Sequence, residues 1–149
     1  MGIELDAIIA PVSGGGVLSG VCLVASALKP EIQVIGGEPM GADDAARSLM
    51  AGHIIPMDGP KTICDGLTSS WSKLPFDICQ KHLDSIVTVS EDEIRAAMRL
   101  QWERVKIVTE ASASVPLAAA MSEFCPLPPG SKVGLIVTGG NVDLENLPF

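Results

Sequence analysis

The sequence has 149 residues, of which 47% are hydrophobic and 19% are charged, and its 18 acidic and 10 basic residues give a net charge of −8. This length supports one domain with a hydrophobic core, and the composition is that of a globular protein rather than a disordered one. The basic residues are scattered singly along the chain. The sequence therefore predicts no binding to nucleic acid or to an anionic membrane surface.

Cysteine spacing and the N-terminal residues bear on metal binding and localisation. The four cysteines lie far apart without a C-x-x-C pair, which argues against a zinc site and indicates buried free thiols in a reducing cytosol. Residues 1–4 lack the basic region of a secretory signal sequence. The uncharged stretch 7–28 is interrupted by proline and glycine, which favours a strand and a helix over a membrane span. A cytoplasmic protein is expected.

A glycine-rich turn joins the first predicted strand to the first predicted helix. Asp6–Val12 is a β-branched run typical of a buried strand, and apolar residues recur at helical spacing over Val17–Leu28. Ser13–Gly16 lies between them. Because glycine has no side chain, the backbone N–H groups and the positive end of the helix can approach an anion closely there. The turn therefore predicts a site for a phosphate or a similar anion.

The remaining strands and helices alternate along the chain. Further strands are predicted for three apolar runs: Ile32–Gly36, Ser85–Val89 and Lys132–Val137. Further helices are predicted at four places: Ala45–Ala51, Phe76–Leu83, Ile94–Val105 and Ser112–Phe124. Residues 52–75 form a long irregular segment, and such segments in compact domains usually serve function.

Three helix starts carry specific expectations. Asp43 is predicted to be the N-cap of the helix that begins at Ala45. Ser90–Glu93 has the pattern of a capping box ahead of an amphipathic helix. Pro116 fits a helix only in its first turn, which places the N-cap of that helix near Ser112 or Ser114.

The alternation of strands and helices predicts an α/β fold with an open, mostly parallel sheet and helices on both faces. Ligands of such sheets bind beyond the carboxyl ends of the strands. Two glycine turns, Ser13–Gly16 and Thr138–Asn141, follow strands at that edge, and Glu38 lies at the end of the second strand. We expect these three features on one side of one crevice.

Two kinds of phosphate-containing ligand fit this pattern. A dinucleotide site would use the first glycine turn together with Glu38 at the end of the second strand. The spacing of Gly14, Gly16 and Gly20, however, misses the G-x-G-x-x-G fingerprint, and Ser19 occupies the place of its third glycine. That fingerprint also gives no reason for the second glycine turn. The other candidate is a phosphorylated cofactor.

Five segments resemble, in the same order, the C-terminal half of serine racemase and the related serine/threonine dehydratases, which are fold-type II pyridoxal-phosphate (PLP) enzymes. The segments are Pro11–Gly20, Gly37–Asp44, Thr62–Gly66, Val89–Ile94 and Ile136–Asp143. They span nearly the whole chain. The resemblance implies the tryptophan synthase beta-like PLP fold, with residues 1–149 as the C-terminal part of the PLP-binding domain.

The resemblance implies a set of cofactor contacts. The residues that would hold the cofactor phosphate are Ser13, Gly14, Gly15, Gly16 and Val17. The family more often has glycine at the position of Ser13, where the hydroxyl could add a phosphate contact. Thr138 matches the residue whose hydroxyl meets the pyridine nitrogen, and a neutral partner there suits elimination and α-proton exchange. Glu110 matches an acidic position near the cofactor ring, and Asp65 and Gly66 line the substrate side in relatives.

The resemblance also implies a metal site and an effector site. Glu38, the carbonyl of Ala42 and Asp44 match the divalent-cation ligands of racemase-like members, and oxygen ligands of this kind suit Mg²⁺ or Ca²⁺. Asn141 lies where racemase-like members bind a nucleotide effector. A homodimer is expected for the full-length protein.

The Schiff-base lysine of these enzymes is not recognisable in the chain. PLP enzymes need such a lysine, which in this family lies in a Ser-Phe-Lys-x-Arg context near the N-terminus. None of the lysines stands in that setting: Lys29, Lys61, Lys73, Lys81, Lys106 and Lys132. The expected whole protein is a PLP-dependent racemase or ammonia-lyase acting on serine or threonine, with the N-terminal half absent here and no catalytic residue in this chain. The alternative is a non-catalytic remnant or assembly module that docks through the surface left bare.

Overall fold

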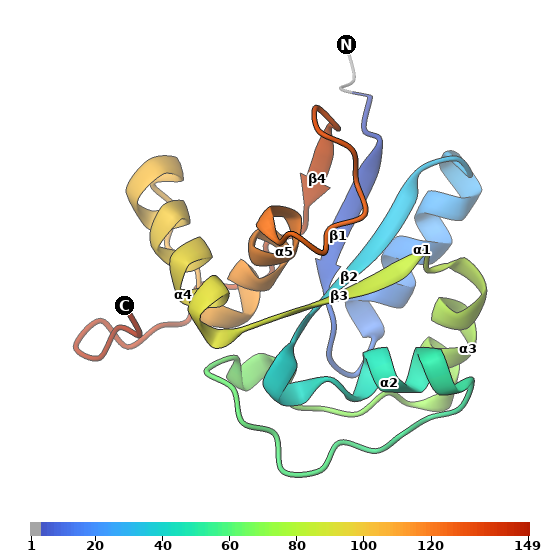
Figure 1. Ribbon diagram of the computed structural model, residues 1–149, viewed down its shortest axis with the longest axis horizontal. Coiled ribbons are helices and arrows are strands. Elements are labelled where there is room, and N and C mark those ends of the chain that lie inside the picture. Colours follow the sequence, from blue (N-terminus) through green and yellow to red (C-terminus); the bar gives the residue numbers. More distant parts are fainter. Residues whose placement is uncertain (1–3) are drawn as a thin grey trace.

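A four-stranded parallel sheet forms the centre of the computed structural model, which describes residues 4–149 (Figure 1). The strands are β1 (Ala7–Pro11), β2 (Gln33–Pro39), β3 (Ser85–Val89) and β4 (Val133–Leu135), in the order β3-β2-β1-β4. The predicted parallel sheet is confirmed. The prediction of no signal sequence rests largely on residues 1–3, which lie outside the described residues.

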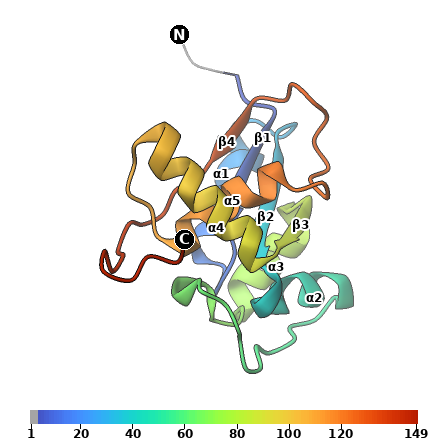
Figure 2. The same ribbon diagram turned by 60° about the vertical axis from the view of Figure 1, so that its left-hand side comes forward.

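Helices cover both faces of the sheet, as predicted (Figures 1 and 2). The helices are α1 (Gly16–Leu28), α2 (Asp44–Ala51), α3 (Lys73–His82), α4 (Glu91–Leu100) and α5 (Ala111–Met121). Helices α1 and α3 pack together on one face, whereas α5 lies on the other face and carries α4 on its outer side. A π-helical turn, Gln101–Val105, follows α4.

The core has two clusters of buried side chains, one on each face of the sheet. Ile9 and Ile35 point toward α5, while Ala10 and Val34 point toward α1 and α3. All four side chains are nearly or fully buried. Central strands of parallel sheets are covered on both faces, so their sequences read as apolar runs rather than as alternating patterns. This explains why β1 and β2 could be recognised from composition.

Two helices that contain proline, α3 and α5, differ from their predictions at the N-terminus. Helix α3 begins at Lys73 and not at Phe76, because Pro75 is only the third residue of its first turn and is tolerated there. Helix α5 begins at Ala111 after Glu110, so the N-cap predicted near Ser112 or Ser114 is wrong. Pro116 is consequently inside α5 and not in its first turn. Burial of this helix against the sheet compensates for the hydrogen bond that proline cannot make.

The capping box ahead of α4 is confirmed. The Ser90 hydroxyl accepts a hydrogen bond from the Glu93 N–H at 3.3 Å, and Glu93 Oε2 accepts one from the Ser90 N–H at 2.7 Å. The pKa of Glu93 is lowered, because Glu93 Oε2 accepts a hydrogen bond from the Ser90 hydroxyl at 2.7 Å as well as the one from the Ser90 N–H. This helix start was predictable because both partners of the motif lie within four residues of each other.

The cysteines are free thiols, and three of them are buried as predicted: Cys22, Cys64 and Cys79. Cys125 is only half-buried, because the turn-rich segment after α5 lies at the surface, so the prediction of burial is wrong there. Along residues 4–149, no helix is long and apolar enough to cross a membrane.

Candidate functional site

The first glycine turn opens α1 at the carboxyl end of β1. Gly15 is the N-cap of α1 and has a φ of 87°, in the left-handed region that favours glycine. A Cβ atom at this position would lie 2.6 Å from Cβ of Pro75 and 2.9 Å from Nε1 of Trp71. The turn is therefore fixed both by its backbone conformation and by the segment packed behind it.

A cavity of about 290 Å³ lies in front of this turn. Its lining combines residues from three distant parts of the chain: Pro11, Ser13, Gly14, Gly15, Gly16, Val17, Gly66, Leu67 and Thr138. Seven of the eight residues predicted to contact the cofactor line this one cavity, and the eighth, Glu110, lies next to it. The structure thus brings together the two glycine turns that the sequence places more than a hundred residues apart. We call this space the glycine-turn cavity.

Backbone N–H groups at the turn are free to bind a ligand. Within residues 4–149, the N–H groups of Gly14, Gly15, Gly16 and Val17 donate to no protein acceptor. The first N–H groups of an α-helix lack partners inside the helix, and together with the helix dipole they form an anion site. The donors and the cavity in front of them therefore fit a phosphate group.

Ser13 occupies the edge of the same cavity. Its Oγ accepts a hydrogen bond from the N–H of Ser69 at 3.2 Å, which ties the glycine turn to the irregular segment predicted at 52–75. The hydroxyl hydrogen stays available, because a hydroxyl that accepts one bond can still donate another. Ser13 therefore brings a side-chain donor to the cavity in addition to backbone N–H groups.

Glu110 is held between the second glycine turn and Gly66. The Glu110 N–H donates to the carbonyl of Gly139 at 3.2 Å, and Glu110 Oε2 accepts from the Asn141 N–H at 3.0 Å. A Cβ atom at Gly139 would lie only 2.8 Å from Glu110 Oε1, so a larger residue there would displace the carboxylate from this position. The Gly66 N–H donates to Oγ of Ser112 at 3.2 Å on the same side. The carboxylate is thus fixed beside the glycine-turn cavity.

A buried hydrogen-bond network behind Glu110 was not predicted. The Thr109 hydroxyl donates to Oε1 of Gln101 at 3.0 Å and lies 3.2 Å from the Ser114 hydroxyl, which donates to the Glu110 carbonyl. Nε1 of Trp102 donates to the Thr109 carbonyl at 2.9 Å. Gln101, Thr109 and Ser114 are nearly fully buried. The sequence showed only that polar residues stand at positions where the helical pattern expects apolar ones. That pattern does not identify their hydrogen-bond partners.

Glu38 lies at the same sheet edge but points away from the glycine-turn cavity. Its Oε1 accepts from the Ala45 N–H at 2.9 Å and its Oε2 accepts from the Ala46 N–H at 2.8 Å, so it caps α2. Asp43 is the N-cap residue of α2, as predicted, but its side chain accepts no hydrogen bond from the helix backbone, and its Oδ1 accepts from Nε of Arg47 at 2.8 Å instead. The expectation that Glu38 shares one crevice with the glycine turns is wrong, because Glu38 does not line the glycine-turn cavity.

Glu38, Ala42 and Asp44 are gathered around the start of α2. Glu38 and Asp44 are each 1% exposed, and within residues 4–149 Oδ2 of Asp44 has no hydrogen-bond partner. Burial raises the pKa of Glu38 to about 8, against the opposing effect of the Ala46 and Ala45 N–H groups. Burial raises the pKa of Asp44 too. Among residues 4–149 neither carboxyl group forms an ion pair with a basic side chain, so both are costly to ionise, and a divalent cation would remove that cost.

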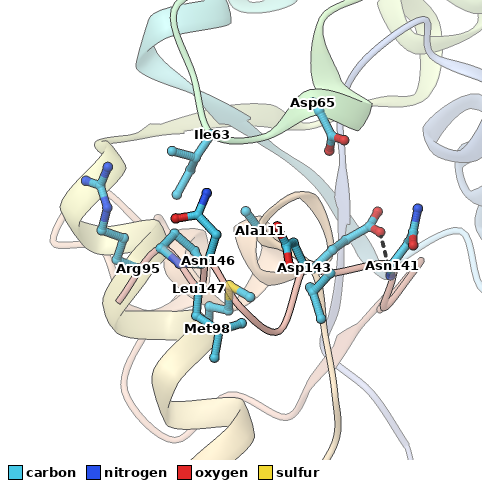
Figure 3. Close-up of a pocket in the computed structure, with 12 residues that line it drawn as sticks. Ile63, Asp65, Arg95, Met98, Ala111, Asn141, Asp143, Asn146 and Leu147 are labelled. Carbon is cyan, nitrogen blue, oxygen red and sulfur yellow. Dashed lines mark hydrogen bonds between the residues drawn. The ribbon is translucent and has the colours of Figure 1, made fainter.

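Asn141 lines a second cavity, of about 500 Å³, between α4 and the C-terminal segment (Figure 3). Its charged lining residues are Asp65, Arg95, Glu110 and Asp143. Arg95 also pairs with Asp92 at 3.1 Å. The dashed line in Figure 3 marks the bond between Glu110 and the Asn141 N–H. Three of these four residues are acidic, so the cavity carries a net negative charge. The phosphate groups of the predicted nucleotide effector would need cations that these residues do not supply.

Comparison with known proteins agrees with this geometry. A family model described as "Pyridoxal-phosphate dependent enzyme" matches residues 1–139. The chain belongs to this family. Two similar curated proteins are a beta-hydroxyaspartate dehydratase of Paracoccus denitrificans (48% identical over 145 residues, 97% of this chain and 46% of the relative) and a serine racemase of Dictyostelium discoideum (48% over 147 residues, 97% and 45%).

Solved structures of the same family share the fold. A threonine deaminase from T.th. superposes with a TM-score of 0.90 at 40% identity, covering 95% of this chain and 52% of that one. Maize serine racemase gives a TM-score of 0.91 at 42% identity, covering 95% and 44%. The chain spans about half the length of the curated relatives that it matches. The resemblance to the tryptophan synthase beta-like PLP enzymes is thereby confirmed, and it replaces the dinucleotide alternative.

Proposed function

We propose that the chain is the cofactor-phosphate-binding part of a PLP-dependent racemase or ammonia-lyase that acts on serine or threonine. The observation that carries this proposal is the glycine-turn cavity, where unpaired N–H groups at the start of α1 meet Gly66 and Thr138. Relatives named serine racemase and threonine deaminase support the substrate class. The activity of the whole protein also depends on the part of the family fold that this chain does not span.

PLP fits the residues of the glycine-turn cavity. The N–H groups of Gly14 to Val17 would bind the phosphate, with the Ser13 hydroxyl as a further donor. Thr138 would offer its hydroxyl to the ring nitrogen, and Glu110 would stand beside the ring. When bound, PLP withdraws electrons from the bonds at the amino acid Cα. The uncharged hydroxyl of Thr138 leaves that nitrogen without an anionic partner, which suits proton exchange and β-elimination.

No lysine lines the glycine-turn cavity among the described residues. The anchoring lysine and the residues that hold the substrate carboxylate would therefore come from the remaining part of the fold. On its own, this chain would bind and orient the cofactor without moving the substrate proton. We also propose a cytoplasmic location, which the buried free thiols of Cys22, Cys64 and Cys79 support.

The same proposal includes a divalent cation, Mg²⁺ or Ca²⁺, at the start of α2. Asp44 Oδ2 is the unpartnered buried oxygen that would bind it, together with Glu38 and the carbonyl of Ala42. Both Glu38 oxygens already accept one N–H, and a carboxylate oxygen has a second lone pair for a metal. The cation would fix the position of α2 relative to β2, away from the reacting atoms.

Two expectations for the full-length protein remain proposals of ours: a homodimer, and a nucleotide effector near Asn141. The acidic lining around Asn141 means that the cations facing such an effector would belong to other parts of the protein. A non-catalytic assembly module is the second candidate function. The observation that favours it is an apolar groove of about 560 Å³ beside α1, where the side chains of Val24 and Leu28 are exposed.

Equilibrium binding of PLP and of pyridoxal, which lacks the phosphate, tests the cofactor proposal on the chain itself. We expect PLP to bind more tightly and inorganic phosphate to compete with it. Thr138→Val should weaken PLP binding by roughly fivefold, the effect of about one hydrogen bond, whereas Thr88→Val on β3 should not change it. Equal binding of PLP and pyridoxal would contradict the phosphate site.

Borohydride reduction of the PLP mixture, followed by peptide mapping, tests the expected lack of an anchoring lysine. Surface lysines should then be modified weakly and at several positions. A single lysine modified in stoichiometric amount would show that the chain anchors the cofactor by itself. That result would overturn the proposal that the anchoring lysine comes from the remaining part of the fold.

A further inference from the structure

Residues 69–71 support the first glycine turn from two sides. The N–H of Ser69 donates to Oγ of Ser13 at 3.2 Å, across 56 positions of the sequence. Trp71 is 3% exposed and packs behind Gly15, where a Cβ atom would lie 2.9 Å from its Nε1. The position of the Ser13 hydroxyl therefore depends on a segment that does not itself line the glycine-turn cavity.

The supporting residues belong to the irregular connection between α2 and α3, residues 52–72, all of which the structure describes (Figure 1). Its one regular element is the short turn Asp65–Leu67. Because such a segment has no strand or helix ladder, individual hydrogen bonds maintain its shape. The Ser70 hydroxyl accepts one of them from the Met57 N–H at 2.6 Å. Ser70 thus fixes its neighbour Ser69 to the first part of the connection.

The first part of the connection is fixed to α2 by Ser48. This side chain is fully buried, and its Oγ donates to the Asp44 carbonyl at 2.6 Å. The same Oγ accepts a hydrogen bond from the Ile55 N–H at 2.8 Å. Pro56 lies between Ile55 and Met57, and its ring restricts the backbone there. Hydrogen bonds and a stiff link thus connect α2 with the residues that support the glycine turn.

We propose that Ser48 and Ser70 are positioning residues for phosphate binding and that they act through the hydroxyl of Ser13. They hold residues 55–71 so that the Ser69 N–H occupies one lone pair of the Ser13 oxygen. The hydroxyl hydrogen is then left for the phosphate in a fixed orientation, and little ordering remains to be done on binding. The inference rests on the proposed phosphate site and adds to it two residues outside the glycine-turn cavity.

Binding of pyridoxine 5′-phosphate and of pyridoxine tests this role on the chain itself. Both compounds lack the aldehyde and therefore do not react with lysines, and EDTA removes any divalent cation. In equilibrium dialysis, Ser13→Ala should weaken binding of the phosphate ester by roughly fivefold, the effect of about one hydrogen bond. Ser70→Ala should weaken it by roughly threefold, because the Ser13 hydroxyl stays but is oriented less well. Neither variant should change the binding of pyridoxine.

Three further variants separate positioning from a general structural role. Ser70→Thr keeps a hydroxyl and should restore the wild-type affinity. Ser13→Ala combined with Ser70→Ala should bind no more weakly than Ser13→Ala alone, because Ser70 acts through Ser13. Ser48→Ala should weaken binding as Ser70→Ala does. Since Ser48 is fully buried, its variant is compared only where urea unfolding shows it to be folded, and the Ser70 variants decide in any case.

Ser122→Ala is the matched control, because Ser122 also accepts a backbone N–H, that of Phe124 at 3.3 Å, but lies outside the glycine-turn cavity. It should bind both compounds as the wild-type chain does. Wild-type affinity of the Ser70→Ala variant would overturn the proposal, and so would a further loss of affinity in the double variant. Equal binding of the two compounds by the wild-type chain would instead refute the phosphate site on which the proposal rests. The two failures are therefore distinguishable.

Discussion

The buried carboxyl of Glu38 makes the stability of this chain depend on pH. Its pKa is raised from 4.5 to about 8 in the folded state, so folding favours the protonated form. The resulting stabilisation is complete below pH 4.5 and is lost as the pH rises through 8. At about 1.4 kcal/mol per pH unit, the free energy of unfolding should fall by roughly 4 kcal/mol between about pH 5 and pH 8.

Urea unfolding from about pH 5 to pH 8.5, in EDTA and in Mg²⁺, measures this effect. In EDTA, Glu38→Gln should remove most of the pH dependence of the free energy of unfolding. The smaller dependence that remains comes from Asp44, whose pKa is raised in the same direction. Glu31→Gln, at an exposed residue, should retain the full dependence. Mg²⁺ should restore stability mainly near pH 8, because it binds the ionised carboxyl groups.

Two results would refute the reasoning about this site. A flat pH profile of the wild-type chain in EDTA would show that Glu38 ionises normally despite being 1% exposed. An unchanged profile in Mg²⁺ would remove the cation from the proposal while leaving the effect of burial in place. The two outcomes are separable because the first concerns the protein alone and the second concerns its ligand.

Two further substitutions probe the site. Gly15→Ala should destabilise the fold by roughly 2 kcal/mol or more and abolish the preference for PLP over pyridoxal. The new Cβ would collide with Pro75, and alanine disfavours the φ of 87° at this position. Gly16→Ala should retain the fold, because no neighbour lies within 4 Å of the new Cβ. Thr109→Val should lower the free energy of unfolding by about 1–3 kcal/mol, because it leaves Gln101 without its hydrogen-bond partner. Replacing both Thr109 and Gln101 by valine should recover most of that loss. Wild-type stability of the single valine variant would contradict the importance of the network.

The local features of the site were predictable from the sequence. The first glycine turn follows an apolar strand and precedes an uncharged helix, and these neighbours alone define a helix N-terminus with free N–H groups. The capping box at Ser90 is equally local. The alternation of strands and helices was sufficient for the parallel sheet, because strands connected through helices run parallel. The family could be recognised because five such segments occur in order.

Contacts between distant segments could be decided only by the tertiary structure. The sequence placed Glu38 at a strand end and Asp43 at the N-cap of α2, but it did not indicate that Glu38, and not the Asp43 side chain, accepts hydrogen bonds from the Ala45 and Ala46 N–H groups. Nor did it indicate that polar residues 101, 109 and 114 would pair behind Glu110. Which of several possible acceptors a donor uses depends on the packing of whole elements, and residue spacing does not record that packing.

Helix α1 illustrates both sides of this division. Its sequence determined that it would be apolar all round, since no charged residue occurs between Gly16 and Leu28. Only the structure showed that one side lies against the sheet and α3 while the other side, with Val24 and Leu28, stays exposed. The hydrophobic effect favours the burial of apolar surface in general. The tertiary arrangement decides which apolar side chains are buried within this chain and which stay exposed.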